Sequence, residues 1–200
     1  MERAWCVFEV LAALDNKVEV VVAFPPKDRE EFERAMKTRE LSLAKFMTIF
    51  GDVNVNNCQA ALKDDRDRIL AKIEGRSDVN DAVMKPLKEF YLRAGEAVAR
   101  AVDAYSFEGG SAFGVLACAY QATGELNTSL QWWNKALAAY HACNAKDEEV
   151  AAMLNNIASV LCSQGKLDEA LKVNNEALAI RQRALGSDHA DVAITVHSTT

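Results

Sequence analysis

Apolar residues in the second half of the chain recur at spacings of three and four, which is the period of an amphipathic helix. The pattern of residues 113–138 returns at residues 154–179, at an offset of 41. Because a repeat of this length is typical of stacked helix pairs, the pattern predicts two complete pairs followed by the start of a third. The predicted units span about residues 111–146, 147–187 and 188–200.

Small residues occupy matching positions in the two complete units. Gly124 and Gly165 follow the first helix of each pair, where glycine can adopt the left-handed conformation that ends a helix. Four alanines occupy positions where two helices are expected to cross, because a methyl side chain lets backbones approach closely. They are Ala117 and Ala158 on the first helices and Ala136 and Ala177 on the second helices. One pair cannot bury its apolar stripe alone, so the pairs are expected to stack into an α-solenoid.

The pattern before residue 108 is different. A short amphipathic helix is predicted over residues 3–14, and the β-branched run at 18–24 is typical of a buried strand. A helix, a strand and a further helix indicate an α/β segment. A parallel sheet needs neighbouring strands, and only one convincing strand is present. This segment is therefore expected to be incomplete, with the chain beginning inside a domain.

Two longer helices are predicted between that strand and the repeats. Asp28 and Glu31 form a capping-box pattern at the start of the first helix. The second is predicted over residues 86–105, with Pro86 in its first turn. The sequence Glu-Gly-Gly at 108–110 predicts a flexible joint. The predicted fold is mostly α, an α-solenoid at residues 111–200 preceded by an incomplete α/β segment at residues 1–107.

Composition and charge narrow the classes of function. Lys and Arg number 23 against 29 Asp and Glu, and the net charge of −6 disfavours nucleic-acid binding, which needs clustered basic residues. No apolar stretch is long enough to span a bilayer. The five cysteines form no C-x-x-C pair and the three histidines are not at ligand spacing from them, so neither a metal site nor a disulfide framework is predicted. A reducing compartment, most simply the cytoplasm, is expected, and no cofactor is predicted.

The second unit resembles a known repeat family. The sequences LNNIA at 154–158, QGKLDEA at 164–170 and ALAI at 177–180 look like a tetratricopeptide repeat. The long second helix and the spacing near 42 are similar to those of the kinesin light chain class. The resemblance implies a protein-interaction scaffold that binds peptide segments on a concave face lined by the first helix of each pair.

The first unit departs from that pattern. Ser129 stands in place of the usual alanine, Gly114 and Val115 replace the paired asparagines, and the adjacent Trp132 and Trp133 are unusual. These departures are typical of a degenerate, capping-like repeat. Adjacent residues point about 100° apart on a helix. Both tryptophans are expected to be partly buried core residues, with one of them as an exposed anchor as the alternative.

The resemblance also implies a set of peptide-binding residues. An amide is useful on such a face because it can both donate to and accept from a peptide backbone. The alternative is that the two asparagines satisfy neighbouring helix groups. The face lacks the lysines and arginines that clamp a terminal carboxylate, so chaperone tails are disfavoured as partners. The candidates are Asn155, Asn156, Ser159, Cys162 and Gln121, on a face completed by Ser111, Gly114, Cys118 and Ala152.

A second resemblance lies near the N-terminus. The sequence RAWCVFEV at 3–10 looks like the W-C-x-x-E-L motif of Toll/interleukin-receptor (TIR) domains. In TIR enzymes that cleave NAD the glutamate of this motif is catalytic, and Glu9 occupies that position here. The pocket that would position the nicotinamide bond comes from strands that this segment lacks. Glu9 is therefore expected to be a partly exposed helix carboxylate, because resemblance in fold does not carry function.

Three functional classes remain open at this point. The leading one is a scaffold or adaptor that binds a protein or peptide, with no catalysis, no metal, and neither nucleic acid nor membrane as a partner. The second is a TIR-like NAD glycohydrolase that acts through Glu9 and uses the repeats as a targeting module. The third is a structural fragment whose repeats do not bind independently.

Overall fold

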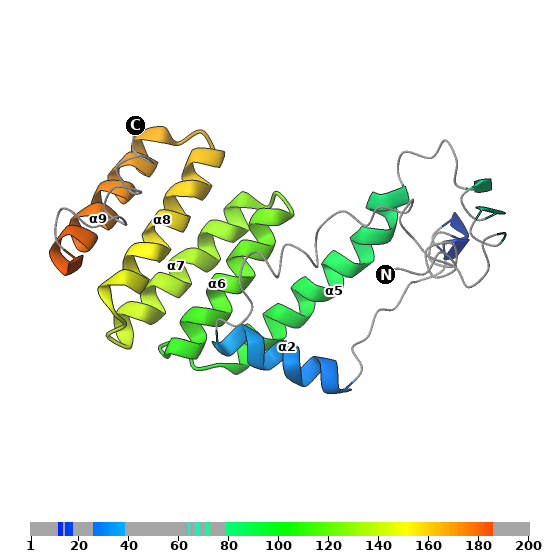
Figure 1. Cartoon of the computed structure of the whole chain (residues 1–200), viewed down its shortest axis with the longest axis horizontal. Helices are drawn as coiled ribbons and strands as arrows, with labels where there is room; N and C mark the ends of the chain where they lie inside the picture. The colour runs from blue at the N-terminus through cyan, green and yellow to red at the C-terminus, as the bar shows by residue number, and fades with distance from the viewer. Residues whose placement is uncertain are drawn as a thin grey trace.

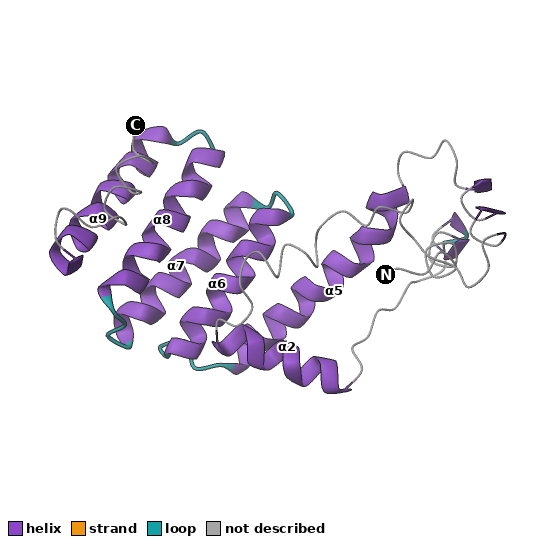
Figure 2. Ribbon diagram, in the orientation of Figure 1, coloured by secondary structure: helices purple, strands orange, loops and turns teal. Residues whose placement is uncertain are grey.

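The computed structural model describes residues 26–38 and 79–185, with isolated positions at 12–13, 15–17, 64, 67–68 and 71–72. Within these residues the chain is helical and has no strand (Figures 1 and 2). The main helices are α2 (Pro26–Thr38), α5 (Val79–Ala101), α6 (Phe107–Ala122), α7 (Leu126–Ala142), α8 (Asp147–Ser163) and α9 (Leu167–Leu185). The predicted mostly helical fold is confirmed for this part. The predicted strand at 18–24 and the motif around Glu9 lie outside the described residues.

Helices α6 to α9 form two antiparallel pairs that lie side by side, α6 with α7 and α8 with α9 (Figure 1). Gly124 and Gly165 lie in the turns of these pairs, with φ angles of +81° and +75°. After each glycine a backbone N–H donates to a carbonyl five residues earlier, Glu125 to Tyr120 and Lys166 to Leu161, both at 2.9 Å. These bonds satisfy carbonyls that the end of the first helix leaves free.

Alanine at Gly124 or Gly165 is expected to lower the free energy of unfolding by about 1–2 kcal/mol, because the left-handed conformation brings Cβ too close to the following carbonyl oxygen. An added Cβ at either position would meet no other atom within 4 Å, so the effect comes from the backbone. Asparagine tolerates this conformation better and is the matched control. Urea denaturation followed by circular dichroism measures both losses. Equal losses for alanine and asparagine would contradict the backbone explanation.

The two pairs pack through small side chains. Three of the four alanines predicted at crossings are fully buried, and the fourth is 1% exposed. These residues are Ala117, Ala136, Ala177 and Ala158. Ser129 is also fully buried, and its hydroxyl donates to the carbonyl of Ala117 at 2.8 Å. Serine can therefore replace alanine here without leaving an unpaired polar group in the core.

Helix α5, which precedes the first predicted unit, has a small residue at the same repeat position as the later second helices. Gly95 of α5, Ala136 of α7 and Ala177 of α9 follow one another at intervals of 41, so each of these helices has a small residue at the same point. Tyr91 corresponds in the same way to Trp132. Helix α5 packs on α6, as α7 packs on α8. Helix α5 is therefore the second helix of an earlier pair, which the repeat pattern alone did not reveal.

Helix α2 packs against both α5 and α6, more extensively against α6, and it runs in the same sense as α5. Phe32 lies against Tyr91 of α5 with ring centroids 5.7 Å apart, and an aromatic pair joins α6 to α7 at the same distance. One turn further along α2, Met36 contacts Gly95. Residue numbers thus rise together on α2 and α5, whereas they run in opposite directions within the pairs α6–α7 and α8–α9.

Two predicted helix starts differ from the structure. Helix α2 begins at Pro26, so Asp28 lies inside the first turn and does not precede the helix as a cap. Proline suits the first turn because it has no N–H that the helix would leave unpaired. Helix α5 begins at Val79, so Pro86 lies inside it and does not mark its start. The preference of proline for a first turn led the prediction to shorten this helix.

The predicted flexible joint at 108–110 is wrong. Gly109 and Gly110 lie in the first turns of α6 and are buried. A Cβ on Gly109 would be 2.2 Å from the carbonyl oxygen of Asp103, and one on Gly110 would be 2.9 Å from the ring of Tyr140. The two glycines are therefore required by close packing and not by a need for flexibility. The division of the chain at this point into two domains stays a prediction.

Candidate functional site

Helix α8 has one buried side and one accessible side. Its buried residues are Val150, Ala151, Met153, Leu154, Ile157, Ala158, Val160 and Leu161. The accessible side carries uncharged residues at helical spacing, and we call it the α8 face: Ala152, Asn155, Asn156, Ser159 and Cys162. Ser159 and Cys162 are exposed, and the other three are half-buried. The core on one side fixes the orientation of the helix, so these side chains stay directed away from it.

Asn155 is bound by the second helix of its own pair. With its amide oriented to match its neighbours, Asn155 Oδ1 accepts hydrogen bonds from both terminal nitrogens of Arg181 on α9, at 2.7 and 3.0 Å. Hydrogen bonds from a guanidinium group are stronger than those between neutral groups, and the forked geometry fixes the amide. The contact favours the alternative in which Asn155 satisfies a neighbouring helix.

The equivalent residues on α6 do not extend this face. Ser111, Gly114 and Cys118 are buried, and Gln121 is half-buried. The hydroxyl of Ser111 donates to the carbonyl of Met36 on α2 at 2.8 Å. A Cβ on Gly114 would be 3.3 Å from the ring of Trp133. The expectation that Ser111, Gly114 and Cys118 line an accessible face is therefore wrong, and burial also raises the pKa of the Cys118 thiol to about 12.

The two adjacent tryptophans are both part of the core region. Trp133 is only 3% exposed. Trp132 is half-buried, with its ring centroid 5.7 Å from that of Phe113 and the Nζ atom of Lys135 3.9 Å from its own centroid. Trp132 is thus covered on more than one side. The two tryptophans therefore have the expected core role, and neither of them is an exposed anchor.

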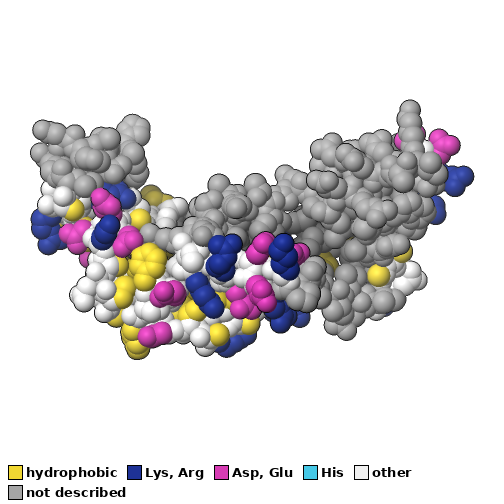
Figure 3. All heavy atoms as spheres, turned by 60° about the horizontal axis from the view of Figure 1, so that its bottom comes forward, with side chains coloured by type: hydrophobic (Ala, Val, Ile, Leu, Met, Phe, Trp, Pro, Cys, Tyr) yellow, Lys and Arg dark blue, Asp and Glu magenta, His cyan; other side chains and the backbone are white. Residues whose placement is uncertain are grey.

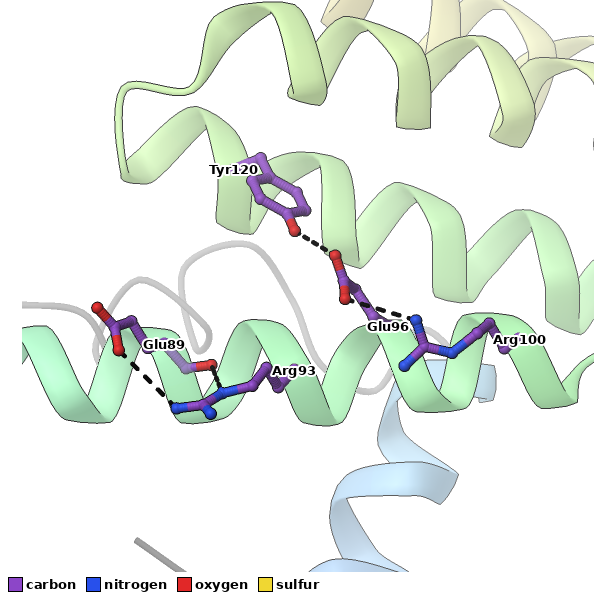
Figure 4. Close-up of polar contacts among 5 residues, drawn as sticks. All are labelled: Glu89, Arg93, Glu96, Arg100 and Tyr120. Atoms are coloured by element: carbon purple, nitrogen blue, oxygen red, sulfur yellow. Dashed lines mark hydrogen bonds and ion pairs between the residues drawn. The ribbon is translucent and has the colours of Figure 1, made fainter. Parts of the chain in front are cut away.

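A polar cluster joins α5 to α6 (Figure 4). The hydroxyl of Tyr120 donates to Glu96 Oε1 at 2.5 Å, and the other carboxylate oxygen of Glu96 is 3.6 Å from Arg100. Burial, followed by the hydrogen bond and the charge of Glu96, raises the pKa of Tyr120. The phenol therefore keeps its proton, and keeps donating, at alkaline pH values where an ordinary tyrosine ionises. This cluster holds α5 against α6. The sequence pattern did not predict it, because Glu96 and Tyr120 belong to different helices.

The described residues offer little for other kinds of chemistry. Among them, no group of three or more His, Cys, Asp and Glu side chains could hold a metal ion. No helix in the same residues is both long and apolar enough to cross a membrane.

Comparison with known proteins identifies the second helix pair. A model of the family described as tetratricopeptide repeat matches residues 150–191. The chain contains a tetratricopeptide repeat. The tetratricopeptide match begins within α8 and includes α9, so the α8 face belongs to the matched repeat.

The arrangement of helices is also similar to that of a solved tetratricopeptide structure. This is a crystal structure from Podosopora anserina, described as kinesin light chain nearly identical TPR-like repeats. The alignment covers 86% of this chain and 82% of that chain, with a TM-score of 0.52 and 16% sequence identity. The likeness shows a common tetratricopeptide-like fold. No curated protein matches the chain.

Proposed function

We propose that the protein is an interaction scaffold that binds a peptide segment of a partner protein on the α8 face. The observation that carries this proposal is the uncharged, accessible stripe on the first helix of the tetratricopeptide repeat, directly opposite a side that is buried throughout. Tetratricopeptide repeats stack into surfaces that serve for binding. The same fold, which is typically not enzymatic, supports a scaffold over an enzyme.

The side chains of the α8 face suit a peptide without strong charge. Asn156 can donate to and accept from a peptide backbone, and the hydroxyl of Ser159 can do the same. Cys162 adds a small and weakly polar contact. Asn155 is engaged by Arg181, so its role is to shape the face. Gln121, half-buried at the equivalent point on α6, is the residue through which the first unit can contribute.

An arginine in the middle of the α8 face is expected to block binding. A peptide array probed with the full chain selects a ligand, whose dissociation constant is then measured by fluorescence anisotropy. Ser159→Arg should weaken binding at least about tenfold, or ~1.4 kcal/mol, because a long charged side chain then covers the small residues of the α8 face. Asn156→Ala should weaken it less, because one amide is lost and nothing is blocked.

The matched control is Asn175→Arg, which adds the same charge at an exposed position on α9. It should leave the dissociation constant unchanged. If both arginine variants weaken binding equally, the effect comes from net charge and the α8 face is not the site. If no peptide binds above background, the repeats have a structural role and the proposal fails.

A further inference from the structure

Helix α2 fills a notch between α5 and α6. We call it the α5/α6 notch, formed by Tyr91 and Gly95 on α5 with Ser111 and Leu116 on α6. Met36 of α2 is fully buried there. A Cβ on Gly95 would be 3.1 Å from Leu116 and 3.4 Å from the terminal methyl of Met36. With glycine at position 95 these two side chains pack closely between the helices, and a Cβ there would require the end of Leu116 or Met36 to move by a few tenths of an ångström.

Ser111 gives the notch a polar contact with the end of the helix that it holds. Met36 belongs to the last turn of α2, where backbone carbonyls lack partners within the helix. The buried hydroxyl of Ser111 donates to that carbonyl at 2.8 Å. The corresponding residue of the second unit, Ala152, has no hydroxyl. The notch thus has space for one long apolar side chain and a hydroxyl that donates to a carbonyl in the last turn of a helix.

Helix α2 is attached to the solenoid differently from the other helices. The first helix of each later pair is joined to its partner by a tight turn and runs antiparallel to it. Residues 39–78 separate α2 from α5, and the two helices run in the same sense. Among the α2 side chains that the structure describes, Phe32 and Met36 are the buried ones. Docking of α2 therefore depends on side-chain contacts and not on a short connection.

The outer side of α2 carries charges of both signs. Lys27, Asp28, Arg29, Glu30 and Glu31 are all exposed. Figure 3 shows basic and acidic side chains interspersed on the face of the molecule where α2 lies. A helix with this surface and two apolar anchors is amphipathic, and it can stay dissolved when it leaves the notch.

We propose that the α5/α6 notch is a helix-binding site, in which an amphipathic helix of a partner protein can replace α2. The partner helix carries an aromatic residue and a long apolar residue four positions apart, to occupy the places of Phe32 and Met36. It runs in the same sense as α5, so that its last turn meets Ser111. This site is separate from the α8 face, and either one can operate without the other.

A labelled peptide with the sequence of residues 26–38 tests the proposal on the full chain. In the variant Met36→Asp the resident helix should leave the notch, because an unpaired buried carboxylate is costly. Fluorescence anisotropy should then show the peptide binding this variant at least tenfold more tightly than the wild type. Met36→Leu, which keeps an apolar side chain, should behave like the wild type. Adding Ser111→Ala to the Met36→Asp chain should weaken binding, and a peptide with aspartate in place of its own methionine should not bind.

Circular dichroism of the Met36→Asp chain separates exchange of a helix from loss of the fold. Binding of the peptide to a chain that keeps its helical signal supports the proposal. A folded variant that does not bind the peptide, or a variant that unfolds, shows that α2 is a fixed part of the core and overturns it. In the wild type, amides of α2 should exchange with solvent deuterium before those of α6. Exchange of both helices together would also overturn the proposal.

Discussion

Replacing Trp133 with alanine is expected to lower the free energy of unfolding by about 3–5 kcal/mol, the usual cost of removing a large buried aromatic side chain. Trp133 is 3% exposed, and its ring faces Gly114 of α6 at the contact between the two helices of the first pair. Gly114 has no side chain that could move into the space left behind. Urea denaturation followed by circular dichroism, with the slope m compared to show that both chains unfold alike, measures the loss.

The adjacent tryptophan provides the control for this prediction. Trp132 is half-buried, and its ring packs on Phe113 with Lys135 above it. Trp132→Ala should cost roughly 1–2 kcal/mol, because less apolar area is returned to water. Losses of the same size for the two variants would show that the ring of Trp133 is not the main filler between α6 and α7.

Replacing Gly109 with alanine is expected to destabilise the chain by about 1–3 kcal/mol or more. The sign of this effect is informative, because alanine inside a helix is normally more favourable than glycine by about 0.5–1 kcal/mol. Here the added Cβ would be 2.2 Å from the carbonyl oxygen of Asp103. That oxygen accepts bonds from both the backbone N–H and the hydroxyl of Ser106, so it cannot shift without breaking them.

Glu108 lies next to Gly109 in the same turn of α6 and is exposed. Glu108→Ala should cost less than about 1 kcal/mol, through the loss of a favourable charge at the start of the helix. Thermal unfolding of the two variants and the wild type compares these effects. A Gly109→Ala chain as stable as the wild type would show that the Asp103 loop yields easily, and that glycine is not required there.

The sequence predicted the helix pairs α6–α9 well because their structure depends on local information. Apolar spacing, together with a glycine that takes a positive φ angle, is sufficient to place a helix, a turn and a second helix. Helix α5 carries the same register, but Gly95 stands where the later helices have alanine, and the position that corresponds to Gly124 is Val83. The interval from Gly95 to Ala136 and Ala177 was the signal that could have revealed it.

The candidate site was only partly predictable, because accessibility depends on contacts between distant segments. Position in the repeat indicated that Ser111 and Cys118 would be as open as the corresponding Ala152 and Ser159. The hydrogen bond from Ser111 to Met36 spans 75 residues, and no periodic pattern indicates that α2 reaches α6. Likewise, the contact of Asn155 with Arg181 depends on how two helices meet. The sequence therefore predicted the accessible side of the second unit. It did not predict that the matching side of the first unit is buried.

Aromatic residues are distributed unevenly along the described helices, and this makes the chain its own optical reporter. Helices α8 and α9 contain no tryptophan, tyrosine or phenylalanine, whereas α7 holds two of the three tryptophans in the sequence. Indole emission from α7 therefore follows the environment of the first pair, while amide absorption follows every helix. On heating, a fall in ellipticity ahead of any change in emission from α7 would place early melting outside the first pair, with no label attached.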